Sequence, residues 1–347
     1  PYRKQMIDRN ATVIEKLEEA GAVLVAKLTL GALAWGDVWF GGTTRNPWDI
    51  TEGSSGSSAG PASATAAGLV PFAIGTETWG SIVSPSTRCG ATGLRPTFGR
   101  VSREGAMALS WSMDKIGPIC RSVCDCAIVF DIIRGPDGKD RTVHDIPFNI
   151  DPGLDLNGFR IGYIKSAFEE DYEWKDTDNA TLERLRELGA ELVPIELPEY
   201  PVYEISFILG AEAAASFDEL TRSGRDDQMV RQVRNAWPNV FRAARLIPAV
   251  EYIQANRIRY MLMRDMEKLG VDVWIAPSFQ GSNLLVTNLT GHPCVVLPNG
   301  FSDEGKPVSI TFNSRLFEEG ILLAVAARYQ ESTTFHKKHP LAFQGLD

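Results

Sequence analysis

Two segments rich in glycine and serine constrain the fold of this chain more than any other feature. They cover residues 53–60 and 75–81, and a run of small side chains at 62–67 and an apolar run at 70–74 lie between them. Glycine and serine favour turns, whereas the small side chains suit a short, closely packed helix and the apolar run suits a buried strand. We therefore predict two loops on either side of a tightly packed helix and strand.

Strand-like and helical segments alternate along the rest of the chain. An amphipathic pattern at residues 8–20 predicts a helix, and the apolar run at 22–26 predicts a short buried strand. Further strands are expected at 159–164, 191–195, 273–276, 294–297 and 308–312, and further helices at 181–188, 204–222, 249–268 and 317–329. The sequence therefore predicts an α/β fold in which helices flank one mixed central β-sheet on both faces.

Composition and charge narrow the classes of function. The chain has 347 residues, of which 44% are hydrophobic and 23% charged, as in ordinary globular proteins. Its apolar runs are shorter than the roughly 18 to 20 residues of a membrane helix, so we expect no membrane association. The net charge of −9 repels phosphate backbones, so we expect no nucleic acid partner.

The five cysteines are an odd number and form no paired Cys-x-x-Cys spacing. They are Cys89, Cys120, Cys124, Cys126 and Cys294. Neither a disulfide framework nor a metal site is indicated, and reduced thiols are typical of the cytoplasm. We therefore expect a cytoplasmic protein with no bound metal.

Residues 42–121 contain a series of motifs in a definite order. The glycine- and serine-rich stretch at 53–60 is followed by Gly75-Thr76-Glu77-Thr78-Trp79-Gly80-Ser81-Ile82, and then by Cys89-Gly90 and Gly93-Leu94-Arg95-Pro96-Thr97. In these motifs and their order, residues 42–121 resemble the amidase signature family. The resemblance implies the amidase-signature fold and a single domain over residues 1–347. Within it, the core signature would cover 42–134, a variable region 135–270, and a return to the core 271–347.

The resemblance assigns roles to individual residues. Ser81 is similar to the family's nucleophile, and Ser57 is similar to the serine that follows a cis peptide bond and relays a proton to a lysine. Ser55 and Ser58 remain alternatives for this bridging position. The backbone N–H groups of Thr78, Trp79, Gly80 and Ser81 are implied to form the oxyanion hole, and Ser58, Trp79 and His292 are implied to bind substrate.

The chain departs from the family pattern at several places, among them Glu77 in place of the usual aspartate and Val83 where arginine is frequent. Trp79 stands where glycine is common, so its indole is expected to narrow the substrate pocket. The family's catalytic lysine precedes the helix expected at 8–20, which places it upstream of Pro1, and Lys27 matches a different family position. We therefore expect residues 1–347 to lack the family's N-terminal segment and its general base.

The predicted function is hydrolysis of a linear carboxamide, through an acyl-serine intermediate, to a carboxylate and ammonia or an amine. The expected partner is a small-molecule amide, no cofactor is implied, and a homodimer is left open. One alternative is a component similar to the A subunit of an amidotransferase, which hands ammonia to a partner. Another is a truncated relative that binds a ligand without turning it over.

Overall fold

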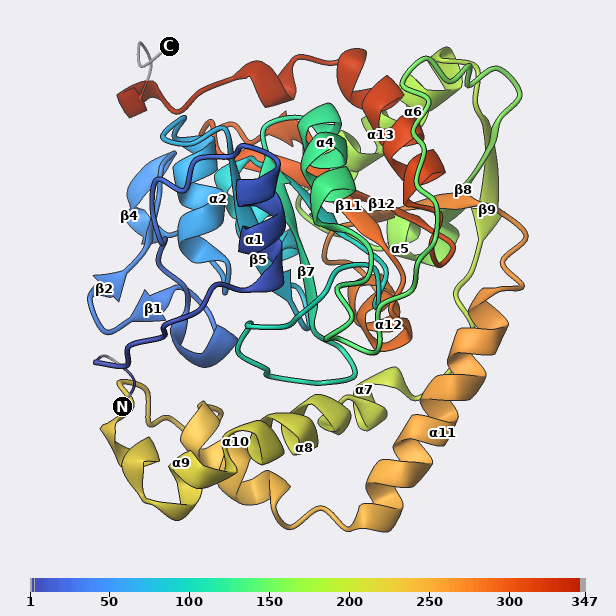
Figure 1. Ribbon diagram of the computed structural model, residues 1–347. Helices are drawn as coiled ribbons and strands as arrows, with labels where there is room; N and C mark the ends of the chain where they lie inside the picture. The colour runs from blue at the N-terminus through green and yellow to red at the C-terminus, as the bar shows by residue number, and fades with distance from the viewer. Residues whose placement is uncertain (1, 3, 344–347) are drawn as a thin grey trace.

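An eight-stranded mixed β-sheet forms the centre of the computed structural model, which describes residue 2 and residues 4–343 (Figure 1). The strands lie in the order β5-β7-β6-β11-β12-β10-β8-β9. Their bounds are β5 (Phe72–Glu77), β6 (Thr92–Arg95), β7 (Lys115–Cys120), β8 (Arg160–Ile164), β9 (Glu191–Ile195), β10 (Val273–Pro277), β11 (Cys294–Phe301) and β12 (Pro307–Ser314). β8 pairs in parallel with β9 and β10, and the other neighbours are antiparallel. This arrangement confirms the predicted α/β class.

Helices cover both faces of the sheet. One face carries α1 (Thr12–Glu19), α4 (Val123–Ile133), α6 (Lys175–Glu187) and α13 (Glu319–Glu331), and the other carries α2 (Ala59–Ala66), α3 (Val83–Cys89) and α12 (Asn283–Thr290). Alternate residues of β11 point to the two layers, since Val295 joins the core under α4 and α13 whereas Val296 packs with Val83 of α3. Burial on both faces explains why this strand reads as a continuous apolar run.

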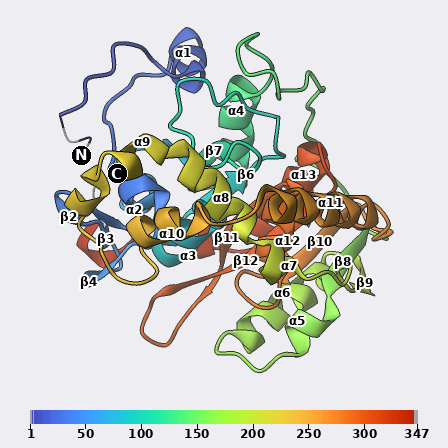
Figure 2. The same ribbon diagram turned by 90° about the horizontal axis from the view of Figure 1, so that it is seen from below.

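A further group of helices lies below the sheet in Figure 1 and nearest the viewer in Figure 2. It consists of α7 (Val202–Ile205), α8 (Phe207–Ser216), α9 (Asp218–Arg222), the 3₁₀ turn η2 (Arg225–Gln228), α10 (Trp237–Ala244) and α11 (Ala249–Met266). The helix predicted at 204–222 is therefore three short helices, whereas α11 matches its prediction. α8 packs against α10, and Phe217, directly after α8, stacks on Phe241 of α10. Leu109 and Leu33 pack in the same cluster, so the group is held against two segments outside it.

The remaining elements are short. They are η1 (Ala32–Ala34), β1 (Val38–Trp39), β2 (Gly42–Thr43), β3 (Arg45–Asn46), β4 (Asp49–Gly53), α5 (Lys165–Glu169), η3 (Phe335–Lys337) and η4 (Leu341–Phe343). No helix within the described part of the chain combines the length and the apolarity that a membrane span requires. The five cysteines are free thiols, and four of them are buried.

The strand predicted at 22–26 is absent, which corrects the sequence-based expectation. This segment belongs to no described strand, and Val23, Leu24 and Val25 are 81%, 59% and 69% exposed. An apolar, β-branched run favours a strand only where a neighbouring strand completes its backbone hydrogen bonds. None of the described strands pairs with it.

Other predicted elements are displaced, and the helix expected at 181–188 begins earlier, at Lys175. The helix expected at 8–20 begins only at Thr12, because Ala11 has an extended backbone with φ −75° and ψ 151°. The strand expected at 70–74 lies at Phe72–Glu77. This shift brings the end of β5 directly to the second glycine- and serine-rich segment.

Candidate active site

The loop after β5 carries Ser81. The strand ends at Glu77, Gly80 adopts a left-handed conformation with φ +89°, and α3 begins at Val83. Glycine adopts this conformation at little cost, so the chain can reverse sharply at Gly80. The turn leaves Ser81 immediately before the helix, with 9% of its surface exposed.

The first glycine- and serine-rich segment lies beside this loop. The Ser58 N–H donates to the Ser81 carbonyl at 3.1 Å, and the Gly31 N–H donates to the Ser57 carbonyl at 3.0 Å. The Ser58 side chain is tied to the backbone of Thr76, with 3.0 Å to its N–H and 3.0 Å to its carbonyl. The peptide bond between Gly56 and Ser57 is cis, as the resemblance implies for the bond before the bridging serine.

The backbone N–H groups of the Ser81 loop have no acceptor within the described chain. Those of Thr78, Trp79, Gly80 and Ser81 donate to no described residue, whereas the next two, of Ile82 and Val83, donate to Glu77. Donors left open beside a partly exposed serine can stabilise negative charge on an oxygen that is brought there. The four N–H groups are therefore free to donate to a group that enters the cavity beside Ser81.

A buried carboxylate anchors this loop to the rest of the fold. The Oε2 of Glu77 accepts the two N–H groups just after Ser81 at 2.8 and 3.0 Å, while its Oε1 accepts from Arg95 at 2.6 Å and Asn288 at 2.8 Å. Burial by itself would raise the pKa of Glu77. The charge of Arg95 and the hydrogen bonds outweigh burial and lower the pKa to about 2, so the group is ionised at neutral pH.

Thr78 is held from the opposite side by Asp114. The Thr78 hydroxyl donates to Asp114 Oδ1 at 2.6 Å, and Asp114 Oδ2 accepts from the N–H groups of Leu109 and Ser110 at 2.8 and 2.9 Å. Burial is the main reason that the pKa of Asp114 is raised, and the hydrogen bonds only partly offset it. The Ser81 loop is thus fixed at both ends by side chains that lie outside it.

Ser81 opens into a cavity of about 520 Å³. Its walls are mainly apolar and aromatic, and its lining residues are Ala34, Trp35, Gly36, Ser55, Gly56, Thr78, Trp79, Gly80, Ser81, Ser84, Leu109, Ser206, Leu209, Gly210, Trp237, Val240, Phe279 and Leu284. None of these described residues is a lysine, a histidine or a carboxylate. The cavity therefore suits an uncharged group.

The predicted site residues are only partly brought together at this cavity. Thr78, Trp79, Gly80 and Ser81 line it, and Trp79 is 38% exposed. Ser57 and Ser58 lie behind the wall, 2% and 0% exposed, next to the lining residue Gly56. The backbones of the two glycine- and serine-rich segments lie close together, as expected.

His292 lies outside the cavity. It is 1% exposed, its Nδ1 is 2.7 Å from the Thr290 hydroxyl, and its ring packs edge-on against Trp274 at 5.8 Å. Burial, and then the charge of Arg95, lower its pKa to about 3, so the ring is neutral. These contacts are those of a core histidine.

Several residues near the site have no signal in the local sequence. Trp35, Trp237 and Phe279 reach the cavity from three distant segments. Lys115 is buried opposite Glu77 in the β5–β7 pair, and its Nζ donates to the Met113 carbonyl. Burial, and then the nearby charge of Arg95, lower the pKa of Lys115 well below its usual value.

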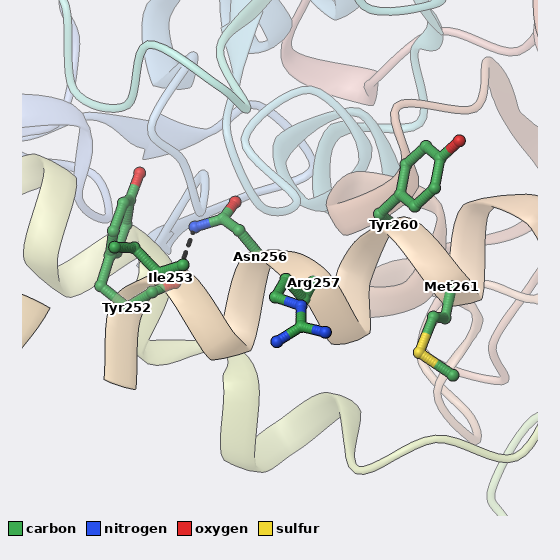
Figure 3. A pocket seen from close by; sticks show the side chains of 6 residues that line it. All are labelled: Tyr252, Ile253, Asn256, Arg257, Tyr260 and Met261. Carbon is green, nitrogen blue, oxygen red and sulfur yellow. Dashed lines mark hydrogen bonds between the residues drawn. The ribbon is translucent and has the colours of Figure 1, made fainter. Parts of the chain in front are cut away.

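A separate hollow of about 500 Å³ runs along α11 (Figure 3). Its lining residues are Tyr252, Ile253, Asn256, Arg257, Tyr260 and Met261. The Asn256 side chain there donates to the Tyr252 carbonyl at 3.0 Å. This hollow shares no lining residue with the cavity at Ser81.

The mixed sheet flanked by helices and the cavity that Ser81 lines define an α/β protein with a serine at a mainly apolar cavity. A family model described as Amidase matches residues 2–323, and the chain therefore belongs to the amidase family. The resemblance predicted from the two glycine- and serine-rich segments is confirmed.

The proteins that are similar to the chain include amidotransferase A subunits and a peptide amidase. The A subunit of glutamyl-tRNA(Gln) amidotransferase from Chloroflexus aurantiacus is 37% identical, over 95% of this chain and 78% of the relative. The crystal structure of peptide amidase from Stenotrophomonas maltophilia matches with a TM-score of 0.81 and 29% identity, over 93% of this chain and 76% of that one. The A subunit of glutamyl-tRNA(Gln) amidotransferase from Thermotoga maritima matches with a TM-score of 0.78 and 28% identity, over 94% and 76%.

Proposed function

We propose that the protein cleaves a carboxamide by transferring its acyl group to Ser81. The observation that carries this proposal is the set of backbone N–H groups at residues 78–81, which have no acceptor in the described chain and surround a serine at a cavity. Attack on an amide carbonyl places negative charge on its oxygen, and preorganised donors stabilise that charge in the transition state. Family membership supports the same reaction class.

The proposed reaction has two halves. The Ser81 oxygen bonds to the carbonyl carbon, the carbon–nitrogen bond breaks, and the nitrogen leaves as ammonia or an amine after it takes a proton. Water then cleaves the resulting ester to a carboxylate and restores the hydroxyl. A base must accept the Ser81 proton and then return it to the leaving nitrogen. We propose that Ser57 relays the proton between Ser81 and that base, because its segment is hydrogen-bonded to that of Ser81.

Replacement of Ser81 tests the proposal. In the native protein S81A is expected to abolish amide turnover, and S57A is expected to lower kcat by roughly 10²- to 10⁴-fold, the range for loss of an acid–base step. Ser63 on α2 lies outside the cavity and donates to the Arg45 carbonyl, so S63A is the matched control. Product release measured by mass spectrometry checks both variants. Full turnover by S81A would refute the proposal.

A second candidate is an amidotransferase component similar to the A subunit. The curated relatives favour it, since those from Chloroflexus and from Picosynechococcus both carry that name and are 37% and 33% identical. The solved structures do not separate the two candidates, because the peptide amidase and the A subunit match about equally well.

Substrate range distinguishes the candidates. Turnover confined to glutamine, together with copurification of other subunits, would assign the amidotransferase role. Turnover of short aliphatic, aromatic or peptide amides without a partner would assign an independent amidase. Binding of amides with no turnover would favour the non-catalytic alternative.

A further inference from the structure

A second cavity of about 400 Å³ adjoins the one at Ser81. The two share Ser55, Ser84 and Phe279, and the hydroxyls of the two serines lie 2.7 Å apart. The second cavity is richer in polar groups, and its lining includes Arg88, Tyr172, Trp174, Asp178, Ser278 and Lys306. A group that extends from Ser81 past the shared residues would enter this polar space.

Asp178, on α6, is a buried carboxyl on the wall of this second cavity. It is 2% exposed, its Oδ1 accepts from Asn299 at 2.7 Å, and its Oδ2 accepts from the Tyr172 hydroxyl at 3.2 Å. No lysine, arginine or histidine among the described residues forms an ion pair with it. Burial raises its pKa to about 7, and the two hydrogen bonds do not offset this effect. Glu77, which is buried beside an arginine, has the opposite shift.

Both basic residues of the second cavity are already neutralised. Lys306 lies 2.7 Å from Glu52, 3.3 Å from Asp49 and 3.5 Å from Glu304, and Arg88 lies 3.2 Å from Glu52. Neither is therefore free to balance a charge on Asp178. Inside the cavity, the buried negative charge without a counter-charge is that of Asp178.

One buried acceptor without a donor in the described chain, and a chain of hydroxyl oxygens, accompany this carboxyl. The Oδ1 of Asn299, whose amide group donates to Asp178, is buried and has no partner in the described chain. Ser278, Ser309 and Thr87 form a chain of hydroxyls at 2.8 and 2.6 Å on the cavity wall. An ammonium group carries three donors and no acceptor, which complements such a surface.

We propose that the second cavity binds a primary ammonium group, with Asp178 as its counter-charge. The aromatic rings of Tyr172 and Trp174 on the same wall also favour a cation. This inference deepens the proposed amide cleavage and rests on it, since it assigns the substrate class as amides that carry a protonated primary amine. The uncharged part of such a substrate would occupy the apolar cavity at Ser81.

A binding experiment tests the ammonium site without requiring turnover. n-Butylammonium is titrated into the whole protein and followed by ligand-observed NMR, with n-butanol as the uncharged probe of similar size. D178N is expected to weaken n-butylammonium binding by about tenfold or more, as expected for loss of a charge-assisted hydrogen bond. The titration is carried out above pH 7, where Asp178 is ionised. The matched control is E173Q, which then removes an equal charge from the exposed rim of the same cavity and is expected to change binding by less than about twofold.

The outcomes separate this inference from the proposed function. S81A is expected to bind n-butylammonium as the unmodified protein does, so failure of amide turnover leaves the binding test intact. Equal weakening by D178N and E173Q, or no weakening by D178N, would overturn the inference. Should D178N fail to fold, the comparison of probes in the unmodified protein decides: n-butylammonium must bind about tenfold more tightly than n-butanol, and equal binding overturns it.

Discussion

Glu77 holds the loop that carries Ser81 in place. Its two oxygens accept four hydrogen bonds, from the backbone after Ser81 and from the side chains of Arg95 and Asn288. Both side chains of the Glu77–Arg95 pair are fully buried. Removing one partner of a buried pair leaves the other charge without compensation, which costs about 3 to 5 kcal/mol.

We expect E77Q to lower the free energy of unfolding at pH 7 by about 3 kcal/mol, because the Arg95 charge stays buried. Urea denaturation measures the change. The exposed Glu183, paired with Arg186 on α6, provides the control, and E183Q is expected to change stability by less than about 1 kcal/mol. Equal stability of E77Q and the unmodified protein would contradict the anchoring role.

The contribution of Glu77 to the free energy of unfolding depends on pH. The pKa of Glu77 is lowered in the folded protein to about 2 from an ordinary value of 4.5, so its stabilising effect is complete above pH 4.5. That effect is lost as the pH falls toward 2, because the folded state must then take up the proton. The stability difference between E77Q and the unmodified protein should therefore shrink over this range.

At the scale of elements, α2 shows how close packing overrides helix propensity. Gly60 lies in the first turn of α2, and its N–H donates to the Thr29 carbonyl at 2.8 Å. A Cβ at this position would lie 2.6 Å from the backbone nitrogen of Thr29 and 2.7 Å from its oxygen. Real contacts of a Cβ with backbone atoms are longer, so the helix would have to move.

We expect G60A to destabilise the protein by about 1 to 3 kcal/mol, the usual effect of overpacking. Helix propensity alone predicts the opposite sign, a gain of up to about 1 kcal/mol from replacing glycine by alanine. Thermal unfolding followed by circular dichroism measures the change. As a control, S63A on the same helix removes one partly exposed hydroxyl and should shift the melting temperature less. A higher melting temperature for G60A would show that propensity dominates.

Helices and strands were predicted correctly where the local sequence pattern alone specifies them. β9 and α11 lie where the sequence predicts them, since one is a short apolar run before a proline-containing segment and the other an unbroken helical stretch. The segment at 22–26 has an equally clear strand pattern and yet forms no strand. Pairing depends on a neighbour that local composition does not specify.

The sequence could predict only those residues of the site that lie together in one contiguous segment. Ser81 and residues 78–80 form one loop, and their place on the cavity follows from one motif. Asp178 and the aromatic walls come from elements far apart in sequence and carry no local pattern. His292 lies in a segment that resembles a family motif, but Thr290 and Trp274 enclose its ring. This burial results from tertiary packing, which the local sequence does not reveal.

At the scale of the whole molecule, Val23, Leu24 and Val25 form an exposed run of apolar side chains. Large apolar side chains in a row, outside any described strand, favour association with other chains. We expect replacement of all three by serine to reduce self-association, measured as a lower light-scattering mass at high protein concentration. Replacing the isolated exposed Leu246 by serine is the control and should leave that mass unchanged. Equal association of the triple variant would contradict this role.

The bond between Glu77 and Asn288 spans 211 positions of the chain. During synthesis, residue 77 therefore leaves the ribosome long before the amide that holds it in place. Until α12 has emerged, the nascent polypeptide carries its serine loop without one of the anchors that shape it. Maturation of the site is thus coupled to completion of the chain, and products of interrupted translation should be inert.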